Sequence, residues 1–342
     1  MTRIEDKYGF PLFSKPVSIV NLGKNEKLII SDIWSFWDYV IKKVKNDKKG
    51  TGFLQSLLEQ AKHFYQTAED SPVKSQPLLY YCSFLNLAKI MINLNGKFGE
   101  DKIYMHGMSE RNNKKFIDSV IIKQKKKEGV VQVAHELVSL FDPYVSESKL
   151  ELNAKCMLNH CVGVHRAYSE IYNQHEIFVR VKSSSLFKHG KSIIFFAELQ
   201  CTKQQMEFLN NIGYSVTVDD SGKCIYKESI TISGQRPNRK EYASLSERIK
   251  EKGVWYYIGN SGYTLYLSTC SEHRYTQESI IYMMMFYLGS ITRYHPYMFD
   301  RIFSDKEQWL MSEFLNTQPK QFLYLATANI LGQSVLKSYS SF

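Results

Sequence analysis

The sequence predicts an α+β protein that is mainly helical at both ends and rich in strands in its middle. Residues 77–94 are apolar or aromatic almost all the way round a helix, which is typical of a helix buried in a helical core. Residues 177–268 instead hold short alternating runs separated by turn residues, as strands do, and helical patterns return after residue 276. We therefore expect an N-terminal helical region, 1–145, a mixed strand-rich region, 146–272, and C-terminal helices, 273–342, that pack on the first region.

The N-terminal region is predicted to hold three helices with short connections, which pack as a bundle. Asp32 is a candidate N-cap for the first helix, 33–43. The run 45–50 reads as a solvated break, and a second amphipathic helix follows over 53–68. The central helix, 77–94, comes third.

Clear signals bound the central helix. Ser75 is a candidate N-cap, Pro77 lies in the first turn, and Asn95-Gly96 is a stop signal. We expect Leu85, in the middle of the helix, to be a core residue. The polar residues fall on one narrow stripe and are Ser83, Asn86, Lys89 and Asn93.

The rest of the chain alternates between strand and helix patterns before it returns to helices. The clearest hairpin joins 255–259 to 263–268 through Asn260-Ser261-Gly262. The other predicted strands are 116–122, 177–181, 192–200, 215–218 and 225–232. The other predicted helices are 131–141, 203–211, 276–288, 305–315 and 318–336.

Composition indicates a folded chain with a basic surface. Hydrophobic residues make up 44% of the chain and charged residues 23%, which excludes a disordered protein. The net charge of +10 favours an acidic partner such as nucleic acid, although lysines outnumber arginines by 34 to 10. Six cysteines without CxxC spacing are expected to be reduced. With no signal peptide or membrane span expected, we predict a cytoplasmic protein.

Several short motifs occur in an order that resembles the YaaC-like family of bacterial proteins. They are Ala61-x-x-Phe64-Tyr65, then Pro77-Leu78-Leu79-Tyr80-Tyr81, then His106-Gly107, and near the C-terminus Gly289 to Pro296 with Arg293-Tyr294. The resemblance covers both ends of the chain better than the middle. It implies a helical core similar to HEPN-type bundles, which occur in nucleic-acid-associated and toxin proteins. The family has no established activity to transfer.

This resemblance makes binding of nucleic acid, or of a nucleic-acid-associated partner, the first functional hypothesis, in bacterial stress or phage (antiviral) defence. A non-catalytic interaction or scaffold subunit is the alternative, with a protein partner or a second copy of the chain. A metal-independent ribonuclease ranks third. HEPN-type enzymes usually have four to six residues between an Arg and the following His, and none of the ten arginines has such a His: eight residues separate Arg166 from His175 and Arg180 from His189.

Three residues are weak catalytic candidates, namely His106, Arg293 and His295, because a cation and imidazoles at one core edge could hold a phosphate. His106-Gly107 also fits a simple turn in which Gly supplies a positive φ and His packs on aromatic rings, and we favour that structural interpretation. Arg293 near a helix C-terminus, before Pro296, has a sufficient structural explanation in the helix dipole.

Basic residues in predicted loops are the candidate nucleic-acid contacts, since phosphate backbones attract such runs. Solvated loops carry similar runs, so the signal is unspecific. The candidates are Arg111, Lys114, Lys115, Lys123, Lys125, Lys126, Lys127, Arg236 and Arg239.

No cofactor, metal or membrane partner is predicted. Cys156, His160, Cys161 and His165 contain ligand residue types but lack a CxxC knuckle, and on one helix the two Cys-His pairs would point to opposite sides. Phosphate-binding and nucleophile-elbow motifs are missing from the sequence.

Overall fold

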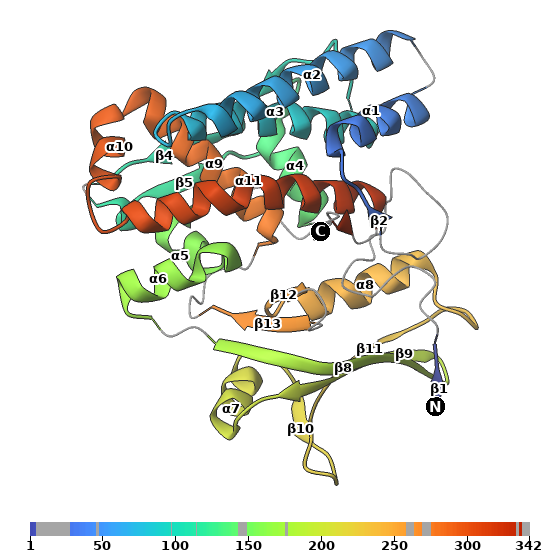
Figure 1. The fold of residues 1–342 in the computed structure, drawn as a ribbon. Helices are drawn as coiled ribbons and strands as arrows, with labels where there is room; N and C mark the ends of the chain where they lie inside the picture. The colour runs from blue at the N-terminus through green and yellow to red at the C-terminus, as the bar shows by residue number, and fades with distance from the viewer. Residues whose placement is uncertain are drawn as a thin grey trace, which may run out of the picture. The chain divides into compact units, whose positions relative to one another are not determined.

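The computed structural model describes residues 1–4, 28–45, 48–96, 98–113, 115–142, 149–174, 177–257, 263–268, 275–332 and 335–336. The chain forms two compact units, each with its own core (Figure 1). The helical unit comprises the described residues within 29–174 and 275–330. The strand-rich unit comprises those within 1–28, 175–274 and 331–336. Residues 149–174, which the sequence assigned to the strand-rich region, therefore belong to the helical unit.

The helical unit consists of helices from both ends of the sequence. They are α1 (Ile33–Val44), α2 (Lys48–Asp70), α3 (Gln76–Leu94), α4 (Val133–Phe141), α5 (Ala154–Asn159), α6 (His165–Tyr172), α9 (Gln277–Tyr294), α10 (Pro296–Ile302) and α11 (Gln308–Leu331). As predicted, Asp32 caps α1: its Oδ1 accepts the backbone N–H groups of Trp34 and Ser35, each at 3.1 Å. Gly96 ends α3 with a φ of +76°.

Helices α3 and α9 run antiparallel through the centre of this unit. The Tyr81 ring lies 5.4 Å from Phe286, while the start of α3 meets α9 at Gly289. A Cβ atom on Gly289 would lie 3.2 Å from the Tyr81 Cβ, so glycine permits the close approach of the two helices. Phe84 of α3 stacks on Phe322 of α11 at 4.1 Å, which joins N- and C-terminal helices in one core.

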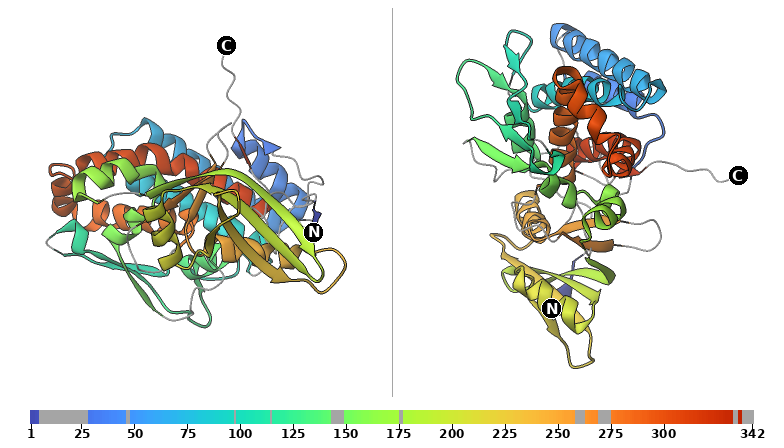
Figure 2. Two further views of the ribbon diagram at one scale, coloured as in Figure 1. Left: turned by 90° about the horizontal axis from the view of Figure 1, so that it is seen from below. Right: turned by 90° about the vertical axis from the view of Figure 1, so that its left-hand side faces the viewer.

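A small three-stranded sheet lies beside these helices (Figure 2). Its antiparallel strands, in the order β4-β5-β7, are Met108–Arg111, Val120–Lys123 and Leu150–Asn153. Two further strands, β3 (Tyr104–Met105) and β6 (Val131–Gln132), form a parallel pair. Two other short strands outside the larger sheet are β2 (Leu28–Ile29) and β14 (Val335–Leu336).

The strand-rich unit is built on an antiparallel sheet with the order β10-β11-β9-β8-β13-β12, and β1 pairs with β8. The strands are β1 (Thr2–Arg3), β8 (Ile177–His189), β9 (Ser192–Gln200), β10 (Val216–Val218), β11 (Cys224–Thr231), β12 (Val254–Tyr257) and β13 (Tyr263–Leu267). Alternate residues of β9, such as Phe195 and Ala197, are fully buried. They share one core with residues of α7 (Lys203–Asn211) and α8 (Arg239–Lys250). Helix α8 runs along this sheet in Figure 1.

The predicted α+β class is confirmed, and β9 and α7 have the predicted bounds. Strand β8 is longer than predicted because a register shift between Val181 and Ser183 lets pairing with β9 continue. Helices α8 and α10 were not predicted, although Asn238 and Glu241 form a capping box at the start of α8. The likeness of the helical core to HEPN bundles stays a prediction.

Helix α11 is one continuous helix where the sequence predicted two. Pro319 lies inside it and cannot donate the usual hydrogen bond. Phe314 on one side of the proline and Phe322 on the other are both fully buried. Packing on both sides therefore keeps the helix continuous despite the missing bond.

Candidate functional site

The face of α3 that is partly exposed to solvent differs from the stripe of polar residues noted in the sequence. Three of the four polar residues are buried and hydrogen-bonded: Ser83 donates to the Ala61 carbonyl at 2.7 Å, and Asn93 donates to the Tyr104 hydroxyl at 2.8 Å. Asn86 is buried as well and donates to the Gln60 side chain at 3.3 Å. The residues of α3 that are partly open to solvent are Leu78, Leu79, Cys82, Leu85 and Lys89, and four of them, at 78, 82, 85 and 89, follow helical spacing. The prediction that Leu85 is a core residue is therefore wrong.

His106 lies beside this stripe, between β3 and β4. The Tyr81 hydroxyl lies 2.6 Å from the His106 Nδ1, and the Phe286 ring lies 6.4 Å from the imidazole. Gly107 follows with a φ of +75°, which only glycine adopts without strain. The expected turn, with His packed on aromatic rings, is thus present. His106 also remains accessible at the surface.

Arg293 reaches the same area from the last turn of α9. Its charge acts on the thiol of Cys82 in α3 and on the imidazole of His106. Its guanidinium carbon lies 5.0 Å from the centre of the Tyr294 ring. Within the described part of the chain, no hydrogen bond or ion pair holds this guanidinium, so the expected capping of helix carbonyls is not seen.

The electrostatics show that these groups act on one another. Burial lowers the pKa of the His106 imidazole, and the charges of Lys89 and Arg293 lower it further. Burial also raises the pKa of the Cys82 thiol, which the same two cations oppose. Lys89 itself is half-buried, and burial lowers its pKa. Both charged groups that shift the pKa of His106 are cations, so His106 is neutral at pH 7 in a positive field.

We call Lys89, His106 and Arg293 the cationic cluster. Among the residues that the structure describes, none of the three is ion-paired with a carboxylate. A carboxylate on the neighbouring strand β4, that of Glu110, accepts a hydrogen bond from Ser290 at 2.7 Å. The cluster therefore offers two positive charges and an imidazole to an anion from solvent, as phosphate-binding sites do.

The third catalytic candidate is not joined to this cluster. His295 ends α9 and begins α10, and its backbone N–H donates to the Ile291 carbonyl at 2.9 Å. Its side chain is exposed, and no described contact connects it with His106 or Arg293. The structure thus unites two of the three predicted residues and adds Lys89, which the sequence showed only as part of a polar stripe.

The candidate nucleic-acid contacts separate into several groups. Lys115, Lys125, Lys126 and Lys127 are exposed on the helical unit. Arg111 is exposed but lies 2.7 Å from Glu151, and its positive charge is partly neutralised there.

Lys123 is a correction: its side chain has 0% exposure, with Nζ 3.2 Å from the Nδ1 of His135. It ends β5 with its side chain turned into the core and therefore cannot contact a phosphate. Arg236 is exposed on the strand-rich unit. Lys114 and the Arg239 side chain lie outside the described residues.

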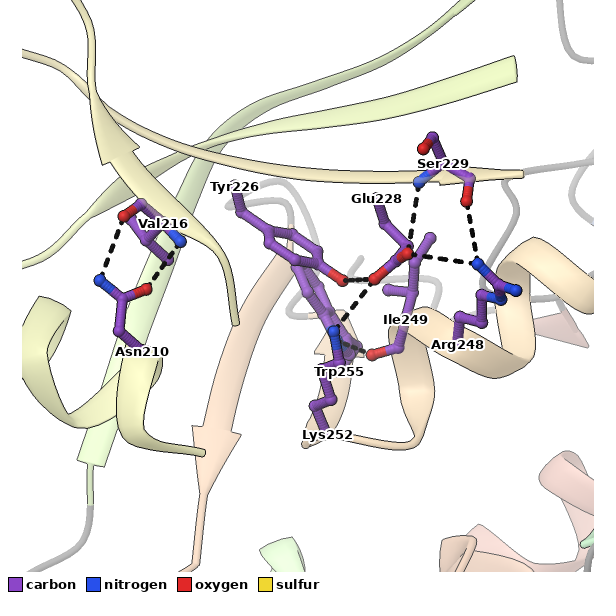
Figure 3. Close-up of polar contacts among 9 residues, drawn as sticks. All are labelled: Asn210, Val216, Tyr226, Glu228, Ser229, Arg248, Ile249, Lys252 and Trp255. Carbon is purple, nitrogen blue, oxygen red and sulfur yellow. Dashed lines mark hydrogen bonds and ion pairs between the residues drawn. The ribbon is translucent and has the colours of Figure 1, made fainter. Parts of the chain in front are cut away.

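The cations beneath the sheet of the strand-rich unit are engaged in a local network (Figure 3). Glu228 of β11 lies 3.1 Å from the Nζ of Lys252 and 3.9 Å from a guanidinium nitrogen of Arg248. The Tyr226 hydroxyl donates to the same carboxylate at 3.2 Å. Because the Glu228 carboxylate and the two cations compensate each other's charge, we interpret the network as a structural link between α8 and the sheet.

The residues with zinc-ligand types have other roles. The Cys161 thiol donates to the Gln318 side chain at 3.2 Å, and the His165 Nδ1 lies 2.6 Å from the Val162 carbonyl. In the described part of the chain, no three His, Cys, Asp or Glu side chains gather as metal ligands. Cys156 is disulfide-bonded, which contradicts the prediction that all six cysteines are reduced. The described free thiols are Cys82, Cys161, Cys201 and Cys224.

Fold and site together define an α+β protein of two units whose helical unit carries an accessible cationic cluster. The chain belongs to the YaaC-like protein family, whose model matches residues 23–330. No curated protein matches the chain, and no solved structure matches it. None of the described helices combines the length and apolar character needed to span a membrane.

Proposed function

We propose that this protein binds nucleic acid and that the cationic cluster holds a backbone phosphate. One observation carries the proposal: Lys89, His106 and Arg293 come from distant parts of the sequence, act on one another electrostatically and, among the described residues, have no carboxylate partner. A half-buried lysine is costly to keep charged unless an anion joins it, whereas the exposed guanidinium of Arg293 is solvated and accessible to the same anion. A phosphodiester supplies that anion.

A second set of cations adjoins the cluster. The backbone N–H of Gln124 donates to the Gly107 carbonyl at 2.9 Å, so the exposed run Lys125 to Lys127 leaves the fold beside His106. Further phosphates of the same strand would lie along these lysines. Counterion release at each contact would supply sequence-independent affinity.

The test is fluorescence anisotropy with labelled RNA and DNA, single-stranded and duplex, at about 50 and about 200 mM salt. Arg293→Ala should weaken binding and reduce the slope of log K against log salt by about 0.7–0.9 for each phosphate that the variant no longer neutralises. The matched control is Arg166→Ala, because Arg166 is on the same unit but lies 2.6 Å from Glu170. Wild-type protein that binds none of the four probes at the lower salt would refute the proposal.

A metal-independent ribonuclease is a second candidate, favoured by the neutral imidazole of His106 next to the guanidinium of Arg293. A neutral His can accept the 2′-hydroxyl proton of RNA while a cation stabilises the charged phosphorane. Cleavage of RNA should then persist in EDTA, fail on DNA and disappear in His106→Ala. If His106→Ala binds RNA normally and wild-type protein does not cleave it, binding stands without catalysis.

An interaction or scaffold subunit is the alternative from another class. The exposed aromatic residues Tyr294 and Tyr297 favour it, because aromatic side chains are enriched at protein interfaces. Light scattering during size-exclusion chromatography distinguishes this alternative. It predicts a self-associated protein whose mass falls in Tyr297→Ala and whose affinity for nucleic acid is negligible.

A further inference from the structure

Two tyrosines are unusually exposed: Tyr294, which contacts Arg293 of the cationic cluster, and Tyr297, three residues further along the chain. Tyr294 has 61% of its surface exposed and Tyr297 has 79%, the highest value among the exposed large hydrophobic side chains of the described residues. Tyrosine normally buries its ring and leaves only the hydroxyl in water. Aromatic rings that lie open to solvent indicate a site where another molecule binds and covers them.

Arg293 connects these rings with the cluster. Its guanidinium carbon is 5.0 Å from the Tyr294 ring, and its charge acts on His106. Two carboxylates on the adjoining elements are engaged: Glu110 accepts from Ser290, and Asp300 of α10 pairs with Lys74 at 2.7 Å. Aromatic faces and positive charge therefore lie side by side on this surface.

The rings stand on rigid elements. Tyr294 ends α9, whose residues from Gln277 to Ile291 are buried. Tyr297 lies in the first turn of α10, which Phe299 and Ile302 anchor in the core. Since Pro296 limits the backbone between them, the backbone positions that carry the two rings are fixed before any ligand arrives. Such preorganisation lowers the entropy cost of binding.

We propose that Tyr294 and Tyr297 form a base-stacking platform, so that the ligand is a single-stranded nucleic acid whose phosphate is held by the cationic cluster. This inference rests on the function proposed above and names its substrate class. In a duplex, each base face is already covered by its neighbours. A single strand offers free faces, and successive bases stack on aromatic side chains while the backbone follows the cations.

The experiment compares three probes of about 12 nucleotides, a length within the range of known single-strand sites. They are a single-stranded RNA, the duplex of the same sequence, and an abasic strand that keeps the phosphates but has no bases. Wild-type protein should bind the single strand best. Tyr294→Ala and Tyr297→Ala should each weaken binding of the single strand by about 5- to 150-fold and leave the abasic and duplex affinities unchanged.

Three variants complete the design. Tyr297→Phe keeps the ring and should keep the affinity. Tyr39→Ala is the matched control, because Tyr39 is 49% exposed and lies under the Lys43 ammonium at 5.6 Å, but belongs to α1. Arg293→Ala should weaken binding of all three probes, and circular dichroism should show each variant folded.

Equal affinity for single strand, duplex and abasic strand would overturn the platform and leave nucleic-acid binding intact. Unchanged binding of the single strand by Tyr294→Ala and Tyr297→Ala would do the same. A fall in oligomeric mass in Tyr297→Ala, without an effect on RNA, would reassign the surface to a protein partner. No binding of any probe at low salt would overturn both this inference and the proposed function.

Discussion

Leu87→Ala is expected to lower the free energy of unfolding of the helical unit by about 2–5 kcal/mol. Leu87 has 0% exposure, so the substitution removes three carbon groups from a closed core. At about 0.8 kcal/mol for each buried carbon, the loss of burial alone amounts to about 2.4 kcal/mol. The cavity left behind raises the cost further, because neighbouring side chains relax only in part.

Leu85→Ala provides the matched comparison. The same three groups are removed from the same helix, so the change in helix propensity is identical. Leu85 lies on the partly open stripe of α3, where water can occupy the vacated space. Since only part of the side chain is buried and no closed cavity forms, we expect a cost of about 1 kcal/mol.

Urea unfolding followed by circular dichroism at 222 nm measures both values. For a unit of about 200 residues, each kcal/mol corresponds to a fall in Tm of about 2–4 °C, so thermal melting gives a second measurement. Equal losses in the two variants would mean that Leu85 is as enclosed as Leu87. The assignment of the open face of α3, and with it the cationic cluster, would then be wrong.

Three further outcomes are expected. Gly289→Val should destabilise the helical unit by about 1–3 kcal/mol in urea, because even a Cβ would lie 3.2 Å from Tyr81. Burial raises the pKa of the Asp142 carboxyl from 3.8 to about 6, although the carboxyl accepts two hydrogen bonds from Thr276. The contribution of the protonated carboxyl to stability is therefore complete below about pH 3.8 and is lost as the pH rises through about 6. At 1.36 kcal/mol per pKa unit, the stability of wild type relative to Asp142→Asn should fall by about 3 kcal/mol over this interval. Changing the three lysines of 125–127 to Glu should weaken binding of all nucleic-acid sequences and flatten the salt dependence, whereas a sequence-selective loss would contradict phosphate contact.

Helix ends and strand bounds that depend on neighbouring residues were predicted correctly from the sequence. The side chain of Asp32 caps α1 because its oxygen accepts the first unpaired N–H groups, and Gly96 ends α3 because it adopts a positive φ. The strand pattern over 192–200 predicted the bounds of β9. Each of these features depends on residues within a few positions of one another, so the sequence carries the whole of the information.

Two predictions from local sequence patterns are wrong because tertiary packing opposes the local preference. Two helices, 305–315 and 318–336, were predicted, but buried side chains on both sides of Pro319 keep α11 continuous. Lys123 looked like one of a run of solvated lysines, yet the pairing of β5 with its neighbours turns its side chain into the core beside His135. In both cases a non-local contact outweighs the local preference.

The sequence alone predicts the α+β class, most of the described helices, the strands of the larger sheet other than β1, the basic character and two members of the cationic cluster as separate candidates. Which face of α3 is open to solvent depends on the packing of other helices against it. That helix is apolar nearly all round, so its own pattern has too little contrast to orient it, and the packing of α9 and α11 selects the face. The same packing brings Lys89, His106 and Arg293 together. Their separation along the chain leaves no spacing rule from which the cluster could be predicted.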